Sequence, residues 1–446
     1  MLTHFIAIAP LSANLHWLPV AIFAVTYILI AIESGRGSHL DRTAAAFCGA
    51  VAMVLFGVLS LDDAYRAVSW DTIIFLLGIM ILVAHFQVSH FFDWIALRVA
   101  AIARTRFQLL VLLVFTTGIL AAFFVNDTIC LMFTPIILML TDRLKLPKLP
   151  YLIALATSAN IGSVMSVTGN PQNALVGVTA HFTFLGFLGR LAPVSVVGLL
   201  LNIALLSFFF RHQLWDAPAL ELAFEPAPDS ANEAAPQNNV ALVPVVVNRA
   251  LLLKCALAAL LVLVLWIMNF SFPLAAAAVG AFILIIGRVK SEIILRRVDW
   301  ELLLFFASLF VVMQGFENSG ATGYLIRFFE PGLRGGVASQ LFAVSGTMLA
   351  LSNLVSNVPA VLLIRPVVNS LPHAHAVWLA VASSSTLAGN ATPISSVANL
   401  IVIQLAAKRT KVTFWEFTRV GIAITVVTSL AAIAILAAEA RLFPAI

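Results

Sequence analysis

Apolar runs long enough to cross a lipid bilayer follow one another along almost the whole chain. Of the 446 residues, 62% are hydrophobic and only 10% are charged, whereas a soluble protein is typically about 45–50% apolar and about 25% charged. Several water-soluble domains could not be covered with so few charges, and a disordered chain would not be so apolar. Because about 20 apolar residues suffice for one span, the pattern predicts an all-α polytopic membrane protein.

Two long apolar segments, 107–141 and 337–370, are each interrupted by only two or three polar residues. These are Asn126, Asp127 and Thr128 in the first segment and Ser356 and Asn357 in the second. Such gaps are too short and too polar for an aqueous loop between two full spans. Non-helical backbone at membrane depth is tolerated only where it is buried in protein or lines a cavity. Each segment is therefore predicted to form a re-entrant hairpin with a polar tip inside the protein.

A stretch that is plainly not membrane-spanning divides the chain. Residues 212–248 hold five prolines and five acidic residues, a composition typical of a flexible linker. On either side of it, residues 1–211 and 249–446 resemble each other: the sequence around Trp70 matches that around Trp300 at an offset of 230 residues. A weak internal repeat of this kind is typical of secondary transporters.

The distribution of basic residues predicts the topology. If the two hairpins do not cross, each half has five spans, and the odd number makes the second repeat inverted. With the N-terminus outside, fifteen Lys and Arg residues fall in cytoplasmic loops and four in outer loops, as the positive-inside rule requires. We therefore expect a multi-pass protein of the inner (plasma) membrane, with both termini outside and the linker 212–248 cytoplasmic.

Two further apolar segments, 150–180 and 374–406, have polar runs with a proline in the middle. Proline removes a backbone donor and clashes with the preceding turn, so both helices should break inside the membrane, where freed backbone groups and half-helix dipoles can bind an ion or a substrate. With the hairpin tips, these breaks supply the candidate substrate-binding residues: Asn126, Thr128, Thr168, Gly169, Asn170, Gln172, Asn173, Ser356, Asn357, Gly389, Asn390, Thr392 and Ser395. A single Asn or Thr in a membrane helix is as often interhelical glue, but four breaks in two repeat-related pairs favour a site.

Asp127 is the one carboxylate deep in an apolar region. A charged Asp at the bilayer centre costs about 2.5–3.5 kcal/mol on insertion scales, so it must be compensated, protonated or in contact with water. Asp127 is thus the best candidate for proton coupling. The alternative is that it caps the second arm of the hairpin, because Asp is a preferred N-cap residue.

Other chemistry is not indicated. The three cysteines lie in apolar runs without a metal-ligand spacing, so neither a metal site nor a cofactor is expected. The basic residues sit in short loops and do not suggest a nucleic-acid partner. No Gly-Lys-Ser/Thr phosphate-binding loop is present, which argues against an enzyme or an ATP-driven pump, although an associated ATPase that engages the cytoplasmic loops is left open.

The polar interruptions carry a family resemblance. The matching motifs are Asn126-Asp127-Thr128, the run from Thr168 to Asn173, Ser356-Asn357-Val358-Pro359, and Gly389-Asn390-Ala391-Thr392-Pro393. At these residues the chain resembles the ion transporter superfamily, and most closely its ArsB/NhaD permease branch, with citrate and dicarboxylate–sodium symporters more distant. The resemblance implies a scaffold domain and a transport domain, often dimeric, that move by an elevator-type or rocking mechanism.

The two hairpin-tip motifs differ from those of the sodium-coupled members of the superfamily, and this difference bears on the substrate class. Sodium-coupled dicarboxylate members resemble Ser-Asn-Thr at both hairpin tips, whereas here the first tip carries Asp127 and the second lacks a threonine. This counts against two symmetric sodium sites and against a dianion beside Asp127. The leading hypothesis is a proton-coupled secondary transporter that exports arsenite or antimonite. The alternatives are a symporter of an anion (a dicarboxylate, citrate or sulfate), a sodium/proton antiporter, and a non-transporting membrane receptor or assembly subunit.

Overall fold

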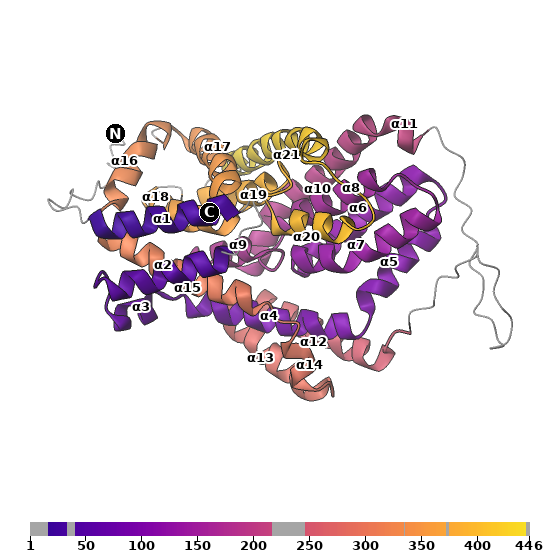
Figure 1. Ribbon diagram of the computed structural model, residues 1–446, viewed down its shortest axis with the longest axis horizontal. Helices are drawn as coiled ribbons and strands as arrows, with labels where there is room; N and C mark the ends of the chain where they lie inside the picture. Colours follow the sequence, from indigo (N-terminus) through magenta and orange to yellow (C-terminus); the bar gives the residue numbers. More distant parts are fainter. Residues whose placement is uncertain (1–16, 34–40, 216–245, 334, 372–373, 443–446) are drawn as a thin grey trace.

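The computed structural model describes residues 17–33, 41–215, 246–333, 335–371 and 374–442, and within these ranges every regular element is a helix (Figure 1). The predicted all-α fold is confirmed. Residues 1–16 and most of the predicted linker 212–248 lie outside the described residues.

The helices form two series in the same order. The first series consists of α1 (Trp17–Glu33), α2 (Arg42–Leu55), α3 (Leu61–Ala67), α4 (Trp70–Val88), α5 (Phe91–Ile102), α6 (Arg106–Phe123), α7 (Asn126–Arg143), α8 (Lys148–Ser163), α9 (Pro171–Thr179) and α10 (Phe184–Phe209). After the short α11 (Arg211–Leu214), the second series consists of α12 (Arg249–Ile267), α13 (Phe272–Ile286), α14 (Ser291–Leu295), α15 (Trp300–Asn318), α16 (Thr322–Leu333), α17 (Val337–Val355), α18 (Asn357–Asn369), α19 (Ala374–Ala388), α20 (Val397–Ala406) and α21 (Phe414–Leu442). Each helix from α1 to α10 thus has a counterpart from α12 to α21.

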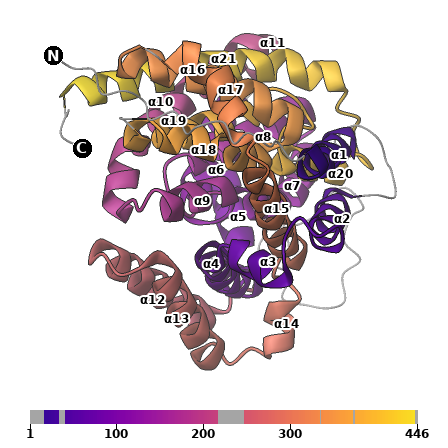
Figure 2. The ribbon, with the colours of Figure 1, turned by 90° about the vertical axis from the view of Figure 1, so that its left-hand side faces the viewer.

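The two series pack against each other reciprocally. Helix α4 packs on α13 of the other series, and the counterpart helices α15 and α2 make the equivalent contact. Within each series the first hairpin arm packs on the broken helix, α6 on α8 and α17 on α19, while α10 and α21 pack on each other. Figure 2 shows α12, α13 and α4 on one side of the molecule and the hairpins and broken helices on the other. This reciprocity is the arrangement of two repeats related by an approximate two-fold axis.

Seven of the described helices are long and apolar enough to cross a membrane: α4, α6, α10, α12, α15, α17 and α21. Helices α2 and α13 have 14 and 15 residues, and at 1.5 Å per residue they reach only about 21–23 Å. The apolar run 43–60 forms only the short α2, because Gly57 adopts a positive φ of 71° and Ser60 then caps α3 with a capping box.

Several short helices occur where the sequence suggested loops. Helix α5 is an example: it contains Arg98, which we expected in a cytoplasmic loop. Its buried residues, Phe92, Ala96 and Ala100, recur every four positions, so one face of the helix packs on α7. The apolar runs in these segments are too short for a membrane span, so span length and hydropathy do not predict these helices.

The hairpins and helix breaks lie where the sequence predicts them. Helix α6 ends at Phe123 and α7 begins at Asn126, and α17 and α18 are joined at Ser356 alone. Ser356 has φ 73° and ψ 161°, a region that almost only glycine adopts. The broken helices are α8–α9, interrupted between residues 163 and 171, and α19–α20, interrupted between residues 388 and 397.

Close helix packing places the first hairpin against the first broken helix. A Cβ atom on Gly162 of α8 would lie only 2.0 Å from the carbonyl oxygen of Gly118 of α6. Only glycine therefore allows the two backbones to approach this closely, one residue before α8 ends. Just beyond these glycines, α6 presents the carbonyl oxygen of Ala122 to Thr168, and α8 ends at Ser163.

Candidate functional site

The helix breaks are capped by two asparagines at repeat-equivalent positions. Asn173 of α9 donates from its amide nitrogen to the carbonyl oxygens of Ser163, Val164 and Ser166, at 3.0, 3.1 and 3.0 Å. Asn399 of α20, 226 residues later, donates to the carbonyl oxygens of Gly389 and Thr392, at 2.7 and 2.9 Å. Each asparagine thereby satisfies carbonyl groups that the end of the first half-helix leaves open.

Asn160 of α8 joins the two repeats. Its amide nitrogen donates to the side-chain oxygens of Asn390 and Asn399, at 3.0 and 3.2 Å. Its side-chain oxygen accepts from the Asn126 amide of the first hairpin tip at 3.0 Å and from the Ser396 hydroxyl at 3.1 Å. Asn160 is 1% exposed, so four hydrogen bonds meet at one buried side chain.

Thr386 of α19, the residue at the offset of 226 from Asn160, makes the reciprocal connection. Its hydroxyl oxygen accepts hydrogen bonds from the side-chain amides of Asn170 and Gln172, both at 3.2 Å. The first half of each broken helix therefore holds the connecting segment of the other repeat. This reciprocal bonding unites the two breaks into one site.

The remaining candidates hold the local backbone in shape. Thr168 donates to the carbonyl oxygen of Ala122 at 3.1 Å, and Gly169 accepts from the backbone N–H of Asn126 at 3.0 Å. Ser395 donates to the carbonyl oxygens of Gly389 and Thr392 at 3.0 and 2.8 Å. These bonds join the first hairpin tip to the α8–α9 segment and close the α19–α20 segment on itself.

The second hairpin makes fewer hydrogen bonds to the site than the first hairpin does. Asn353, near the end of α17, donates to the carbonyl oxygen of Ala388 at 3.3 Å. Ser356 and Asn357, at the tip, are half-buried. Thr128 of the first hairpin is also half-buried. All four predicted interruptions therefore converge, with the second tip at the edge of the hydrogen-bonded network.

Four buried side-chain atoms of the candidate residues have no hydrogen-bond partner within the described part of the chain. Three are acceptors, Oδ1 of Asn126, Asn173 and Asn357, and one is a donor, Nδ2 of Asn390. The two hairpin-tip asparagines, Asn126 and Asn357, are repeat-equivalent. Because buried polar atoms are nearly always paired in proteins, these four atoms are available to a water molecule or a ligand.

Asp127 lies in the first turn of α7 and is half-buried. No hydrogen bond or ion pair reaches its carboxylate from the residues that the structure describes, and Arg42 and Asp299 are the charged groups that act on it electrostatically. The N-cap of α7 is Val125, without a side-chain hydrogen bond. The alternative interpretation of Asp127 as the capping residue is therefore wrong. Its carboxylate lies near the positive end of the helix dipole without a hydrogen-bond partner among the described residues.

Several residues of the network were not among the candidates. They are Asn160, Ser163, Asn353, Thr386, Ser396 and Asn399. Applying the repeat offset of 226 to the candidate Asn173 would have identified Asn399. Asn160 itself is one polar residue in a run of small and apolar ones, and the run gives no sign that it faces both repeats.

Two helical repeats whose hairpin tips and broken helices meet in one buried polar site define a secondary transporter. Comparison with known sequences agrees: the chain belongs to the citrate transporter family (CitMHS), which it matches over residues 27–388. That family is part of the ion transporter superfamily that the motifs resemble. The protein is thus a multi-pass membrane transporter.

The relatives cover nearly the whole chain. An uncharacterized transporter of Mycobacterium tuberculosis is 30% identical over 93% of this chain and 96% of its own length. A silicon efflux transporter of Oryza sativa subsp. japonica is 28% identical, covering 91% and 94%, and a putative transporter of Dictyostelium discoideum named arsB is 24% identical, covering 92% and 90%.

A solved structure shares the fold. The crystal structure of the Alcanivorax borkumensis YdaH transporter, described as having an unusual topology, superposes with a TM-score of 0.53 over 94% of this chain and 96% of that one. At 13% identity, this likeness supports the architecture alone.

Proposed function

We propose that this protein is a proton-coupled secondary transporter that exports a small, neutral, polyhydroxylated oxyacid, with arsenous acid and its antimony analogue as the leading substrates. The carrying observation is the set of buried amide oxygens without partners, Oδ1 of Asn126, Asn173 and Asn357. The ArsB/NhaD-like motifs and the relative named arsB support this substrate class.

The chemistry of the unpaired atoms favours a ligand that donates. Arsenous acid is neutral near pH 7 and carries three hydroxyl groups, each able to donate to an amide oxygen. A citrate or sulfate anion instead needs donors or cations, and the candidate residues include neither Lys nor Arg but do include Asp127. Silicic acid, the neutral hydroxylated form of silicon in water, fits the same acceptors, and the rice relative is named for silicon efflux.

The roles of the residues follow from their partners. Asn126, Asn357 and Asn390, each with an unpaired atom, bind the substrate together with the Asn173 side-chain oxygen. The other candidates shape the site through their backbone or local bonds: Thr128, Thr168, Gly169, Asn170, Gln172, Ser356, Gly389, Thr392 and Ser395. Asp127 carries the proton, since its carboxylate has no committed partner within the described residues.

The loop charges predict an orientation with both termini outside and the linker 212–248 cytoplasmic. The first hairpin then enters from the cytoplasm and the second from outside, and an alternating-access motion exposes the shared site to each side in turn. Protons moving inward would drive the oxyacid outward.

A second candidate is a symporter of citrate or a related anion, because the family carries the citrate transporter description. It would require a compensating cation at the acceptor-rich site. Amide oxygens also suit sodium, so a sodium-coupled mode and sodium/proton exchange belong in the same experiment.

The test is transport into proteoliposomes under an imposed pH gradient, with arsenite, antimonite, silicic acid, citrate and sulfate compared with and without sodium. We expect pH-driven movement of arsenite or antimonite that Asp127→Asn uncouples from the gradient. Asp93→Asn is the control, because Asp93 pairs with His90 at 3.0 Å on α5. Citrate movement that depends on sodium would overturn the proposal, and so would gradient-driven arsenite transport by Asp127→Asn.

A further inference from the structure

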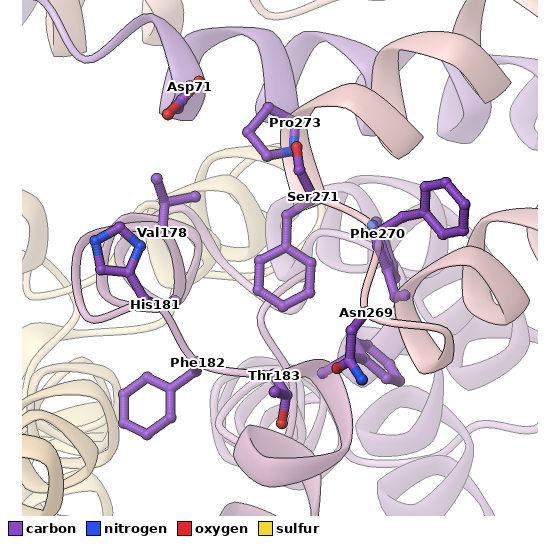
Figure 3. A pocket seen from close by; sticks show the side chains of 13 residues that line it. Asp71, Val178, His181, Phe182, Thr183, Asn269, Phe270, Ser271 and Pro273 are labelled. Atoms are coloured by element: carbon purple, nitrogen blue, oxygen red, sulfur yellow. The ribbon is translucent and has the colours of Figure 1, made fainter.

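Two cavities lie between α12 and the first repeat's broken helix and hairpin. The outer cavity, about 310 Å³, is bounded by the turn between α9 and α10, the turn between α12 and α13, and the start of α4. Figure 3 shows its labelled side chains around an open centre, with Asp71 from α4, His181 and Phe182 from one turn, and Asn269 from the other. This outer cavity is open to the surface and has polar groups around its rim.

The inner cavity, about 210 Å³, borders the site at Thr168 and is partly open beside the first hairpin, where Phe123 is 38% exposed. It is lined by residues of α4, α12, the first hairpin tip and the α8–α9 segment: Ile79, Leu82, Val83, Phe123, Phe124, Thr168, Ala259, Val262, Leu263 and Trp266. Thr168 is hydrogen-bonded to Ala122 beside the hairpin tip, and Phe124 is two residues from Asn126. A water molecule occupies about 30 Å³ in the liquid, so either cavity has room for a small oxyacid.

Trp266 is the one described residue that lines both cavities. It is 2% exposed, and its ring is held by Phe184, Phe75 and Phe272, with ring centres 5.3, 5.8 and 5.8 Å away. Its indole N–H is buried without a hydrogen-bond partner in the described part of the chain. A buried tryptophan N–H usually finds an acceptor, so this group indicates where an oxygen atom of a ligand binds.

The lining of the inner cavity selects by charge. Of the described residues that line it, only Thr168 and Trp266 have polar side-chain atoms. An ion that entered would lose its hydration with little to replace it, and that cost far exceeds the cost for a neutral hydroxylated molecule. The passage therefore suits the neutral oxyacid of the proposed function better than citrate or sulfate.

We propose that the two cavities form the passage between the site and the surface at the α9–α10 and α12–α13 turns, and that Trp266 is its gate. The indole ring separates the cavities, and its N–H binds an oxygen of the oxyacid as the molecule passes. This inference rests on the proposed function for the identity of the ligand but not for the existence of the passage. The loop charges place these turns outside, which makes the outer cavity the exit.

Cysteine accessibility tests the passage without any substrate. Cys48, Cys130 and Cys255 are replaced by alanine, and single cysteines are introduced by Val178→Cys in the outer cavity, Val262→Cys in the inner cavity, and Val264→Cys as a control on the lipid-facing side of α12. The protein is held in nanodiscs, where both faces meet a small charged thiol reagent, so its orientation does not affect the result.

We expect the cysteine at position 178 to react, and those at 262 and 264 to stay inert while Trp266 is present. Adding Trp266→Ala should raise the labelling rate at position 262 about tenfold or more, the effect of shifting a closed population toward open by one order of magnitude, and should leave position 264 inert. Rapid labelling at 262 with Trp266 intact would overturn the gate. Continued protection at 262 after Trp266→Ala would overturn the passage.

The binding role of the N–H has its own comparison. Trp266→Phe keeps a ring and removes the donor, so oxyacid transport in proteoliposomes should slow about two- to tenfold, the effect of one hydrogen bond. Trp378→Phe is the matched control, because that buried tryptophan already donates to Asn369 at 3.2 Å and lines neither cavity. Equal effects of the two changes would refute the role of the Trp266 N–H. If no oxyacid moves at all while labelling behaves as expected, the proposed substrate fails and the gated passage stands.

Discussion

The side chain of Asn160 makes four buried hydrogen bonds to the first hairpin tip and the second broken helix, and its removal should loosen the whole site. Asn160→Ala leaves the amide of Asn126, the hydroxyl of Ser396 and the side-chain oxygens of Asn390 and Asn399 without this partner. Interhelical hydrogen bonds in membrane proteins are worth about 0.6–1.7 kcal/mol each, so the expected loss is about 2–7 kcal/mol.

Asn202→Ala is the matched control. Asn202 is equally buried, but its side chain bonds only to Thr157, at 3.0 and 3.2 Å, and both residues belong to the first repeat. The same atoms are removed from a fully enclosed position, so the packing loss is similar and the polar loss is about 1–3 kcal/mol. The difference between the variants therefore measures the connection between the repeats.

The assay is equilibrium unfolding of the purified protein in mixed micelles, followed by oxyacid transport of each variant. We expect Asn160→Ala to be the less stable variant by about 1 kcal/mol or more and to lose transport, and Asn202→Ala to retain it. Equal stability of the two variants would refute the reasoning, because it would mean that the bonds from Asn160 are replaced freely by other partners.

Two further outcomes are expected. Ser356→Gly should stabilise the protein by about 1 kcal/mol, because glycine relieves the strained backbone at φ 73°. Ser308→Gly, the same change inside α15, should destabilise it by a similar amount. Thermal unfolding measures both changes, and two stability changes of the same sign would contradict the strain argument. The pKa of Asp142 lies below its usual value because Lys148 donates a hydrogen bond to its carboxylate at 2.5 Å. A carboxylate with a lowered folded-state pKa stabilises above its unfolded pKa and loses this contribution as the pH falls through the folded value. The difference in unfolding temperature between the wild type and Asp142→Asn should therefore be constant from neutral pH to about pH 5 and shrink below it; a constant difference at lower pH would exclude the pairing as its source.

The architecture was predictable because it follows from backbone hydrogen bonding in a bilayer. Long apolar runs can only become helices there, and breaks such as Asn170-Pro171 can only be tolerated inside the protein, so the hairpins and broken helices lie where the sequence places them. The short helices α3, α5, α14 and α16 were not predicted, because their apolar faces are narrow and the helices they pack against lie elsewhere in the chain.

The location of the candidate site was predictable from the sequence, but the hydrogen bonds within it were not. Polar residues at the breaks were recognised from their type, but the sequence does not tell which side chains cap the helix ends and which remain unpaired. Asn173 shows the difference, since its amide nitrogen caps α8 while its oxygen stays unpaired. Asn160 and Thr386 were missed because a contact between distant segments leaves no local pattern in either of them.

The exchange of hydrogen bonds between the two broken helices also governs how the protein can be assembled. Asn170 and Gln172 find their partner at Thr386, 216 and 214 residues further along the chain, and Asn160 finds Asn390 and Asn399 only after 230 and 239 residues. While the chain is synthesised, the first repeat must therefore wait in the membrane without these partners until nearly all of the second has been inserted. The site is completed in one late step, and a truncated chain that ends before α19 has no means of completing it.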